Sequence, residues 1–99
     1  MAIAEVTIIP IGTGSTSLSS YVADLQRVLG KQEGITYTLT SMSTIIEGNL
    51  DNVFAAIRAI HEAPFQAGAG RVSTSIKIDD RRDKASSSEQ KLRSVREKL

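Results

Sequence analysis

The fold is decided by residues 35–48, which read ITYTLTSMSTIIEG. From residue 35 to residue 40, apolar side chains alternate with threonines, and a period of two is typical of a strand with one buried face. The chain reverses around residues 41–42, and residues 43–48 form a second strand. The stretch is therefore predicted to be a hairpin, and the fold follows from what flanks it.

Strand and helix patterns lie on both sides of this hairpin. Residues 3–10 alternate as a strand. Ser17 or Ser19 can cap a helix in which apolar residues within 18–29 recur at helical spacing. Asn49 can cap a second helix, which we expect to end at Pro64, and residues 71–79 alternate as a last strand. The order β-α-β-β-α-β specifies an α+β ferredoxin-like sandwich, in which a four-stranded antiparallel sheet carries both helices on one face. The apolar strand residues predicted to pack against these helices are Ala4, Val6, Ile8, Ile35, Tyr37, Leu39, Val72, Ile76 and Ile78.

The C-terminal segment has a different composition. Residues 79–84 mix acidic and basic side chains, and Ser86 and Glu89 have the spacing of a capping box. A narrow apolar stripe follows, made of Leu92, Val95 and Leu99. We predict a ferredoxin-like domain over residues 1–84 and a helical extension over residues 85–99. The extension packs on its own protomer or a neighbour, with a frayed tail as the alternative.

Composition excludes several classes of protein. The 99 residues, 40% hydrophobic and 23% charged, suit one ordinary globular domain. No apolar run reaches the length of a membrane span, and the N-terminus lacks a basic, cleavable leader, so the expected compartment is the cytoplasm. There is no cysteine for disulfides or thiolate chemistry. A net charge of +1 and only two Tyr and two Phe give no drive toward nucleic acid.

The sheet face without helices carries an intermediate composition. Its predicted members are mainly small hydroxyl residues with a few aliphatics: Ile3, Glu5, Thr7, Ile9, Thr36, Thr38, Thr40, Ser73, Ser75 and Lys77. A solvated face usually has more Lys and Glu, and a core face has fewer hydroxyls. We expect this face to pack sheet-to-sheet against another copy of the chain, as a homodimer or homotetramer. A solvated face is the alternative.

A small-molecule niche is predicted between the two central strands. The first and third strands are antiparallel neighbours in this fold, so the end of the first strand should lie beside the start of the third. Ile9 and Ile11 would supply apolar walls, and Ser43 and Thr44 would supply polar anchors. A mostly apolar niche with a few polar groups is the usual character of a ligand site.

Other candidate chemistry is weaker. Gly12-Thr13-Gly14 lacks the third glycine of a dinucleotide loop, and one histidine, His61, makes no metal cluster. Glu47 has two interpretations of equal weight: an ion-pair partner for Lys77 or Arg71, or an acceptor for a ligand's amino group. The charged run 79–84 is self-neutralising, or else an inorganic anion site at an interface. No acid–base pair or nucleophile arrangement is evident, so we expect neither catalysis nor a metal.

Several blocks of the chain together resemble the small thiamine-binding protein family, the YkoF-like proteins. The blocks are Val6 to Thr13, Met42 to Gly48, Asp51 to Val53, His61-Glu62, Arg71 to Asp79, and Arg82 to Lys84. They occur in order and cover nearly all of residues 1–84. The chain departs from the family pattern at Ser43, where members commonly have Gly, and at Asn49, where they commonly have Asp.

The resemblance implies a ferredoxin-like protomer that pairs sheet to sheet, often as a dimer of dimers. It also implies non-catalytic binding of thiamine or its hydroxymethylpyrimidine part, with no other cofactor. Carried over by position, Thr44 matches the binding threonine, Ser43 lies beside it, Ile9 and Ile11 match the strand-end wall, and Glu47 is a further binding candidate. The alternative function is a structural or regulatory oligomer without a thiamine ligand.

Overall fold

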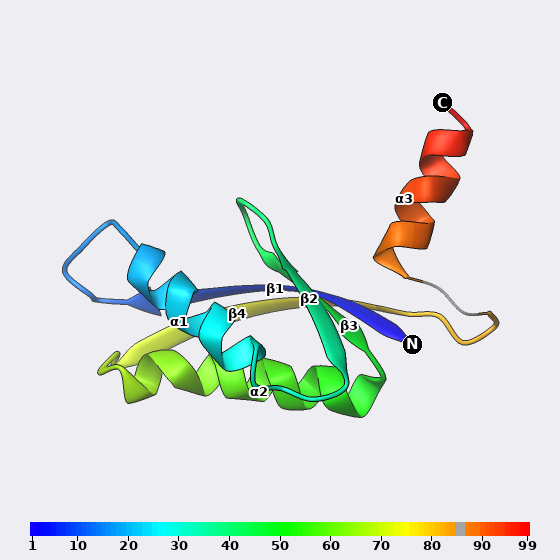
Figure 1. Ribbon diagram of the computed structural model, residues 1–99. Helices are drawn as coiled ribbons and strands as arrows, with labels where there is room; N and C mark the ends of the chain where they lie inside the picture. The colour runs from blue at the N-terminus through cyan, green and yellow to red at the C-terminus, as the bar shows by residue number, and fades with distance from the viewer. Residues whose placement is uncertain (85–86) are drawn as a thin grey trace.

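The computed structural model describes residues 1–84 and 87–99, and it confirms the predicted α+β sandwich (Figure 1). The elements are β1 (Ala2–Ile11), α1 (Ser19–Leu29), β2 (Ile35–Leu39), β3 (Thr44–Gly48), α2 (Leu50–Gln66), β4 (Arg71–Asp80) and α3 (Ser88–Glu97). The sheet order is β2-β3-β1-β4, with every neighbouring pair antiparallel. The first and third strands are therefore the central neighbours, as predicted.

Strand alternation separates the two faces of the sheet. In β1, Ala4, Val6 and Ile8 are buried against the helices, whereas Glu5 and Ile9 are exposed on the opposite side, which we call the open face. The long β1 pairs with β4 along its whole length but with β3 only as far as Val6. Residues 7–11 of β1 therefore extend beyond β3 and pair with β4 alone.

The core lies between the two central strands and the helices. Its members are Ala2, Ala4, Val6, Ile8, Leu25, Leu29, Ile46, Val53, Ala56, Ile57 and Ile60. Three residues predicted for the core, Tyr37, Leu39 and Ile76, are instead partly exposed. The reason is their place on the edge strands β2 and β4, which two helices packed over the sheet centre do not fully cover. Cavities lie beside both edge strands, one lined in part by Leu39 of β2 and another by Ile76 of β4.

Two predicted helix boundaries were wrong. Ser17 and Ser19 were candidates to cap α1, but the N-cap is Leu18 and no side chain caps this helix. The two serine hydroxyls lie 3.3 Å from each other instead. Helix α2 begins as predicted, with Asn49 Oδ1 accepting a hydrogen bond from the Asn52 N–H at 2.9 Å.

Helix α2 does not end at Pro64, however, but continues through it to Gln66. Pro64 lacks an N–H, which costs one backbone hydrogen bond near the helix end. Its ring is almost completely buried, and this packing offsets the loss. The helix closes when the Ala67 N–H donates to the Ala63 carbonyl and the Ala69 N–H donates to the Pro64 carbonyl.

Helix α3 extends away from the rest of the molecule (Figure 1). None of its residues is buried, and Leu92, Val95 and Leu99 are all exposed. The Ser87 side chain caps it by accepting a hydrogen bond from the Gln90 N–H at 3.1 Å. The predicted cap Ser86 lies outside the described residues. The division of the chain after Lys84 into domain and extension stays a prediction.

Candidate functional site

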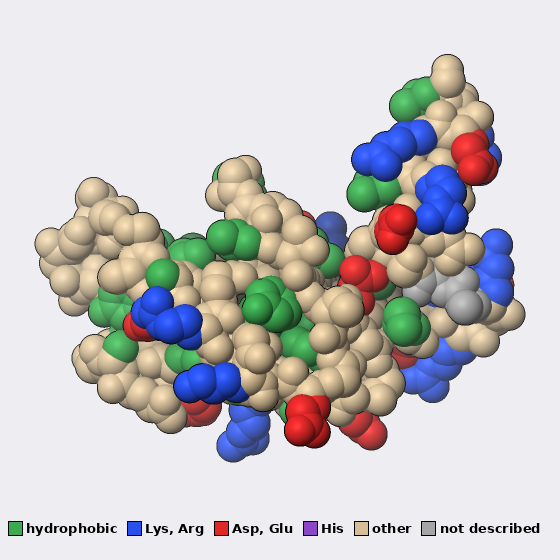
Figure 2. All heavy atoms as spheres, viewed as in Figure 1, with side chains coloured by type: hydrophobic (Ala, Val, Ile, Leu, Met, Phe, Trp, Pro, Cys, Tyr) green, Lys and Arg blue, Asp and Glu red, His purple; other side chains and the backbone are tan. Residues whose placement is uncertain are grey.

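A cavity lined mostly by apolar side chains lies between α1, β1 and the raised β2–β3 hairpin. Its volume is about 370 Å³, and we call it the hairpin cavity. Figure 2 shows hydrophobic side chains between α1 and the raised hairpin. Its apolar wall is formed by Val6, Ile8, Ile9, Leu18, Val22, Leu25, Leu39, Met42 and Ile60, and its polar members are Thr7, Thr40, Ser41, Ser43 and Thr44.

Thr44 is the buried polar residue of this cavity. It is only 6% exposed, and it lies opposite Val6, so its side chain points to the helix side of the sheet. Its hydroxyl oxygen accepts a hydrogen bond from Gln26 Nε2 of α1 at 3.2 Å. A buried hydroxyl without a partner would be costly, and Gln26 removes that cost.

The sequence interpretation missed Gln26, although a signal for it exists. Gln26 follows Val22 by four residues and precedes Leu29 by three, so it lies on the inward face of α1. A polar side chain on the apolar face of a helix usually has a specific partner. Here that partner is the predicted ligand-binding threonine.

Ser43 lies at the turn of the hairpin and is held in place by several contacts. Its hydroxyl donates to Glu5 Oε2 at 3.1 Å, which links the hairpin to the open face of β1. The Thr40 hydroxyl donates to the Ser43 carbonyl at 2.9 Å and accepts from the Ser43 N–H at 3.0 Å. Ser43 therefore borders the cavity from a fixed position, and Glu5 places a carboxylate beside it.

The strand-end isoleucines occupy different positions from those expected. Thr44 pairs with Val6 rather than lying beside the end of β1, so Ile9 and Ile11 continue past the start of β3. Both are exposed and alternate onto the open face, opposite to Thr44. Ile9 still contributes to the wall of the hairpin cavity, whereas Ile11 does not.

Glu47 is separate from Thr44 and lies at the other end of β3. Its Oε1 accepts a hydrogen bond from the Ser88 N–H at 2.7 Å, at the start of α3. A carboxylate at a helix N-terminus is a favourable arrangement, because it complements the helix dipole. Among the described residues, no ion pair joins Glu47 to Lys77 or Arg71, the partners that the sequence suggested.

Glu47 also borders a second hollow, of about 420 Å³, together with Met1, Gly34, Ile35, Thr36, Gly48, Ser87 and Glu89. A third hollow of about 410 Å³ lies between α2 and β4, lined by Phe54, Ile57, Arg58, His61, Thr74 and Ile76. Neither of these two hollows is lined by Thr44, Ser43, Ile9 or Ile11, the remaining predicted site residues. Thr44, Ser43 and Ile9 thus meet at one cavity, and Glu47 belongs to another.

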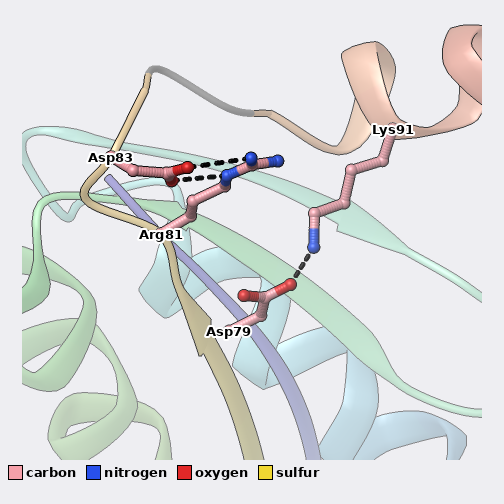
Figure 3. Close-up of polar contacts among 4 residues, drawn as sticks. All are labelled: Asp79, Arg81, Asp83 and Lys91. Atoms are coloured by element: carbon pink, nitrogen blue, oxygen red, sulfur yellow. Dashed lines mark hydrogen bonds and ion pairs between the residues drawn. The ribbon is translucent and has the colours of Figure 1, made fainter.

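Two ion pairs form within the run from Asp79 to Lys84, in agreement with the self-neutralising alternative. Arg81 Nε donates to Asp83 Oδ1 at 2.6 Å, and Arg82 Nη2 donates to Asp80 Oδ2 at 2.7 Å. These hydrogen bonds lower the pKa of both carboxyl groups below the ordinary value and raise the pKa of both guanidinium groups. Figure 3 shows the Arg81–Asp83 pair, and Lys91 reaching from α3 to Asp79.

His61 is half-buried on α2, and its Nδ1 lies 2.6 Å from the Thr74 hydroxyl of β4. Its ring meets the Phe65 ring edge-on, with centroids 5.6 Å apart. In the two described stretches of chain, no three His, Cys, Asp or Glu side chains are grouped as metal ligands would be. Over the same residues, no helix combines the length and the apolarity needed to cross a bilayer.

Comparison with known proteins identifies the family. Residues 4–96 match the family described as thiamine-binding protein. The chain belongs to the thiamine-binding protein family. The UPF0045 protein YqgV of Bacillus subtilis is 61% identical over 102 residues, which cover 100% of this chain and 98% of that relative. Membership confirms the resemblance that the sequence blocks indicated. This family is not a known family of enzymes.

Solved structures share the fold. A hypothetical protein from Methanocaldococcus jannaschii, MJ1052, superposes with a TM-score of 0.85 at 36% identity, covering 97% of this chain and 96% of that one. A Thermotoga maritima protein whose description connects it with thiamine biosynthesis or salvage superposes with a TM-score of 0.75 over 95% of this chain and 97% of that one. At 14% identity, the second likeness shows the fold alone.

Proposed function

We propose that this chain binds thiamine, or its hydroxymethylpyrimidine part, in the hairpin cavity and does so without catalysis. The observation that carries the proposal is Thr44. In a chain of the thiamine-binding protein family, Thr44 places one buried hydroxyl in an otherwise mostly apolar cavity. An aromatic heterocycle fits such a site, because its faces are apolar and its ring nitrogens accept hydrogen bonds.

The size and charge of the site support the same ligand class. A cavity of about 370 Å³ falls within the range of roughly 300–1,000 Å³ that small-molecule sites occupy. Glu5 lies within hydrogen-bonding distance of Ser43, and a carboxylate near the cavity favours a cation over an anion. Thiamine carries a positive charge on its thiazolium ring, so it meets this condition.

We propose further that the binding protein is a homodimer or homotetramer that associates through the open face. Ile9 and Ile11 are exposed there among hydroxyl side chains, and the apolar stripe of α3 is exposed as well. A stable interface buries about 800 Å² per partner. The alternative function is an oligomer of structural or regulatory role that takes no thiamine.

Calorimetric titration with thiamine tests the binding function. Thr44→Val keeps the side-chain shape but removes the hydroxyl, so thiamine affinity should fall up to about tenfold. Thr36→Val is the matched control, because Thr36 lies on the open face of β2 away from the hairpin cavity. Equal thiamine affinity of wild type and Thr44→Val would show that the binding site lies away from Thr44. No heat from wild type at millimolar thiamine would favour the structural alternative.

A further inference from the structure

The hydrogen bond from Gln26 determines which atom of the Thr44 hydroxyl remains for a ligand. A threonine hydroxyl has one proton to donate and two lone pairs that accept. Gln26 Nε2 donates to this oxygen at 3.2 Å and so occupies one lone pair. Within residues 1–84 and 87–99, no hydrogen bond takes up the hydroxyl proton itself. The Thr44 proton is therefore available for an acceptor in the hairpin cavity that Thr44 lines.

The position of Gln26 explains why its amide keeps this partner. Gln26 is half-buried on the inward side of α1, next to the buried Leu25. Leaving a buried amide without a hydrogen-bond partner is unfavourable, so the hydrogen bond to Thr44 stabilises this position of the Gln26 side chain. The bond also joins α1 to β3 across 18 residues of sequence, which fixes the hydroxyl on a rigid part of the fold rather than on a loop.

We infer that Gln26 is a positioning residue that makes the hairpin cavity select ligands by a hydrogen-bond acceptor. With Thr44 held as a donor toward the cavity, the site favours a ligand that places an aromatic ring nitrogen there. A ligand that places a C–H or an N–H at the same point loses this bond. The inference rests on the proposed function, because it assumes that the ligand is a nitrogen heterocycle bound beside Thr44.

Reversing the Gln26 bond should reverse the selection. A carboxylate only accepts hydrogen bonds, so in Gln26→Glu the Thr44 hydroxyl must donate to residue 26. Only lone pairs of the hydroxyl would then face the cavity. Gln26→Met keeps the length of the side chain but removes the hydrogen bond, which leaves the hydroxyl free to rotate. In this variant the preference for a ligand with a hydrogen-bond acceptor should weaken without reversing.

The experiment measures affinity for two probes that differ at one atom. Hydroxymethylpyrimidine is titrated against analogues in which one ring nitrogen is replaced by C–H, with each ring position replaced in turn. Wild type should prefer the parent compound over one of these analogues by up to about tenfold. In Gln26→Glu this preference should reverse, so that the C–H analogue binds better than the parent compound, and in Gln26→Met it should be reduced.

Gln32→Glu is the matched control. Gln32 follows the same helix and donates to the Val28 carbonyl at 3.5 Å, so its replacement adds the same charge without touching Thr44. Its preference should equal that of wild type. Thermal melting of each variant checks the fold, and Gln26→Met carries the test if Gln26→Glu does not fold.

The outcomes separate this inference from the proposed function. If wild type binds the parent compound and every analogue equally, or if Gln26→Glu and Gln26→Met keep the wild-type preference, the inference is overturned while the binding function stands. An equal loss of preference in Gln32→Glu would also overturn it, since charge alone would then be responsible. If wild type binds no probe, the proposed function fails, and this inference fails with it.

Discussion

The polar side chains at the two ends of the sheet differ in burial and in the kind of partner they have. At the hairpin end, Thr44 is 6% exposed and bonded to Gln26 inside a mostly apolar cavity. At the α3 end, the charged residues from Asp79 to Asp83 pair with one another and with Lys91 at the surface. Buried hydrogen bonds depend strongly on geometry, whereas exposed ion pairs contribute little and are screened by salt. This difference supports the proposal that specific recognition takes place at the hairpin end.

The largest expected effect is on the free energy of unfolding, which a substitution in the sheet core should lower far more than one in α3. Ile46, at the middle of β3, is completely buried, and Ile46→Ala should lower the free energy of unfolding by about 2–5 kcal/mol, because it leaves a cavity in the core. Val95 of α3 is 58% exposed, and Val95→Ala should change it by less than about 0.5 kcal/mol. Urea denaturation measures both. Similar losses would show that α3 is packed as firmly as the core.

Removal of residues 85–99 should affect assembly more than folding. The protomer core contains no residue of α3, so the melting temperature of the truncated chain should stay close to that of the full chain. The apolar stripe of α3 would be lost, and we expect a lower mass in sedimentation at micromolar concentration. Leu92→Ser is a milder variant that removes one apolar side chain of the stripe and should act in the same direction.

An unchanged mass for the truncated chain, together with an unchanged melting temperature, would show that α3 is dispensable. A full-length chain that is already a monomer at micromolar concentration would contradict the proposed association through the open face. Neither result would bear on the proposed binding of thiamine at the hairpin cavity, because that cavity is lined by residues of α1, α2 and the sheet.

The smallest expected effect is the pH response of the exposed pairs. Arg82 and Arg81 lower the pKa of Asp80 and Asp83, so any stability from these pairs is present above the ordinary carboxyl pKa of about 3.9. It is lost as the pH falls through the lower, folded-state pKa. Because pH 7 and pH 5 both lie above that range, the contribution of these pairs should be the same at both, and they should cause no difference between the melting temperatures measured at pH 7 and pH 5.

Carboxyl-carbon NMR titration checks the direction of this shift. In Arg82→Gln, the titration midpoint of Asp80 should move up toward the ordinary value, while that of Asp83, which is bonded to Arg81, should not. An Asp80 midpoint that is the same with and without Arg82 would refute the assigned cause.

The sequence predicted the elements well because their patterns are local. Period-two alternation fixed the strands, and Asn49 marked the start of α2 through its capping chemistry. Pro64 misled the prediction of the helix end, because a proline near the last turn costs one hydrogen bond that its burial offsets. Local sequence does not contain that tertiary contact.

The site was harder to predict because it depends on strand register. Thr44 and Ser43 were chosen for the cavity and do border it, but Ile11 and Glu47 lie elsewhere. Pairing of Thr44 with Val6 sets this arrangement, and the lengths of β1 and β3 alone do not give that register. Gln26 could have been suspected from its place on the inward face of α1, but its partner could not, because the bond crosses from helix to sheet.

Amide NMR spectra of the isotope-labelled protein during titration with thiamine test the binding of thiamine at the hairpin cavity most directly. We predict that the largest shift changes occur at Val22, Thr44 and their neighbours around the cavity. The amides of Glu47 and Ser88, at the other end of the sheet, should change little. Changes concentrated at Glu47 and Ser88, with none at Thr44, would contradict the assignment and place the ligand beside α3.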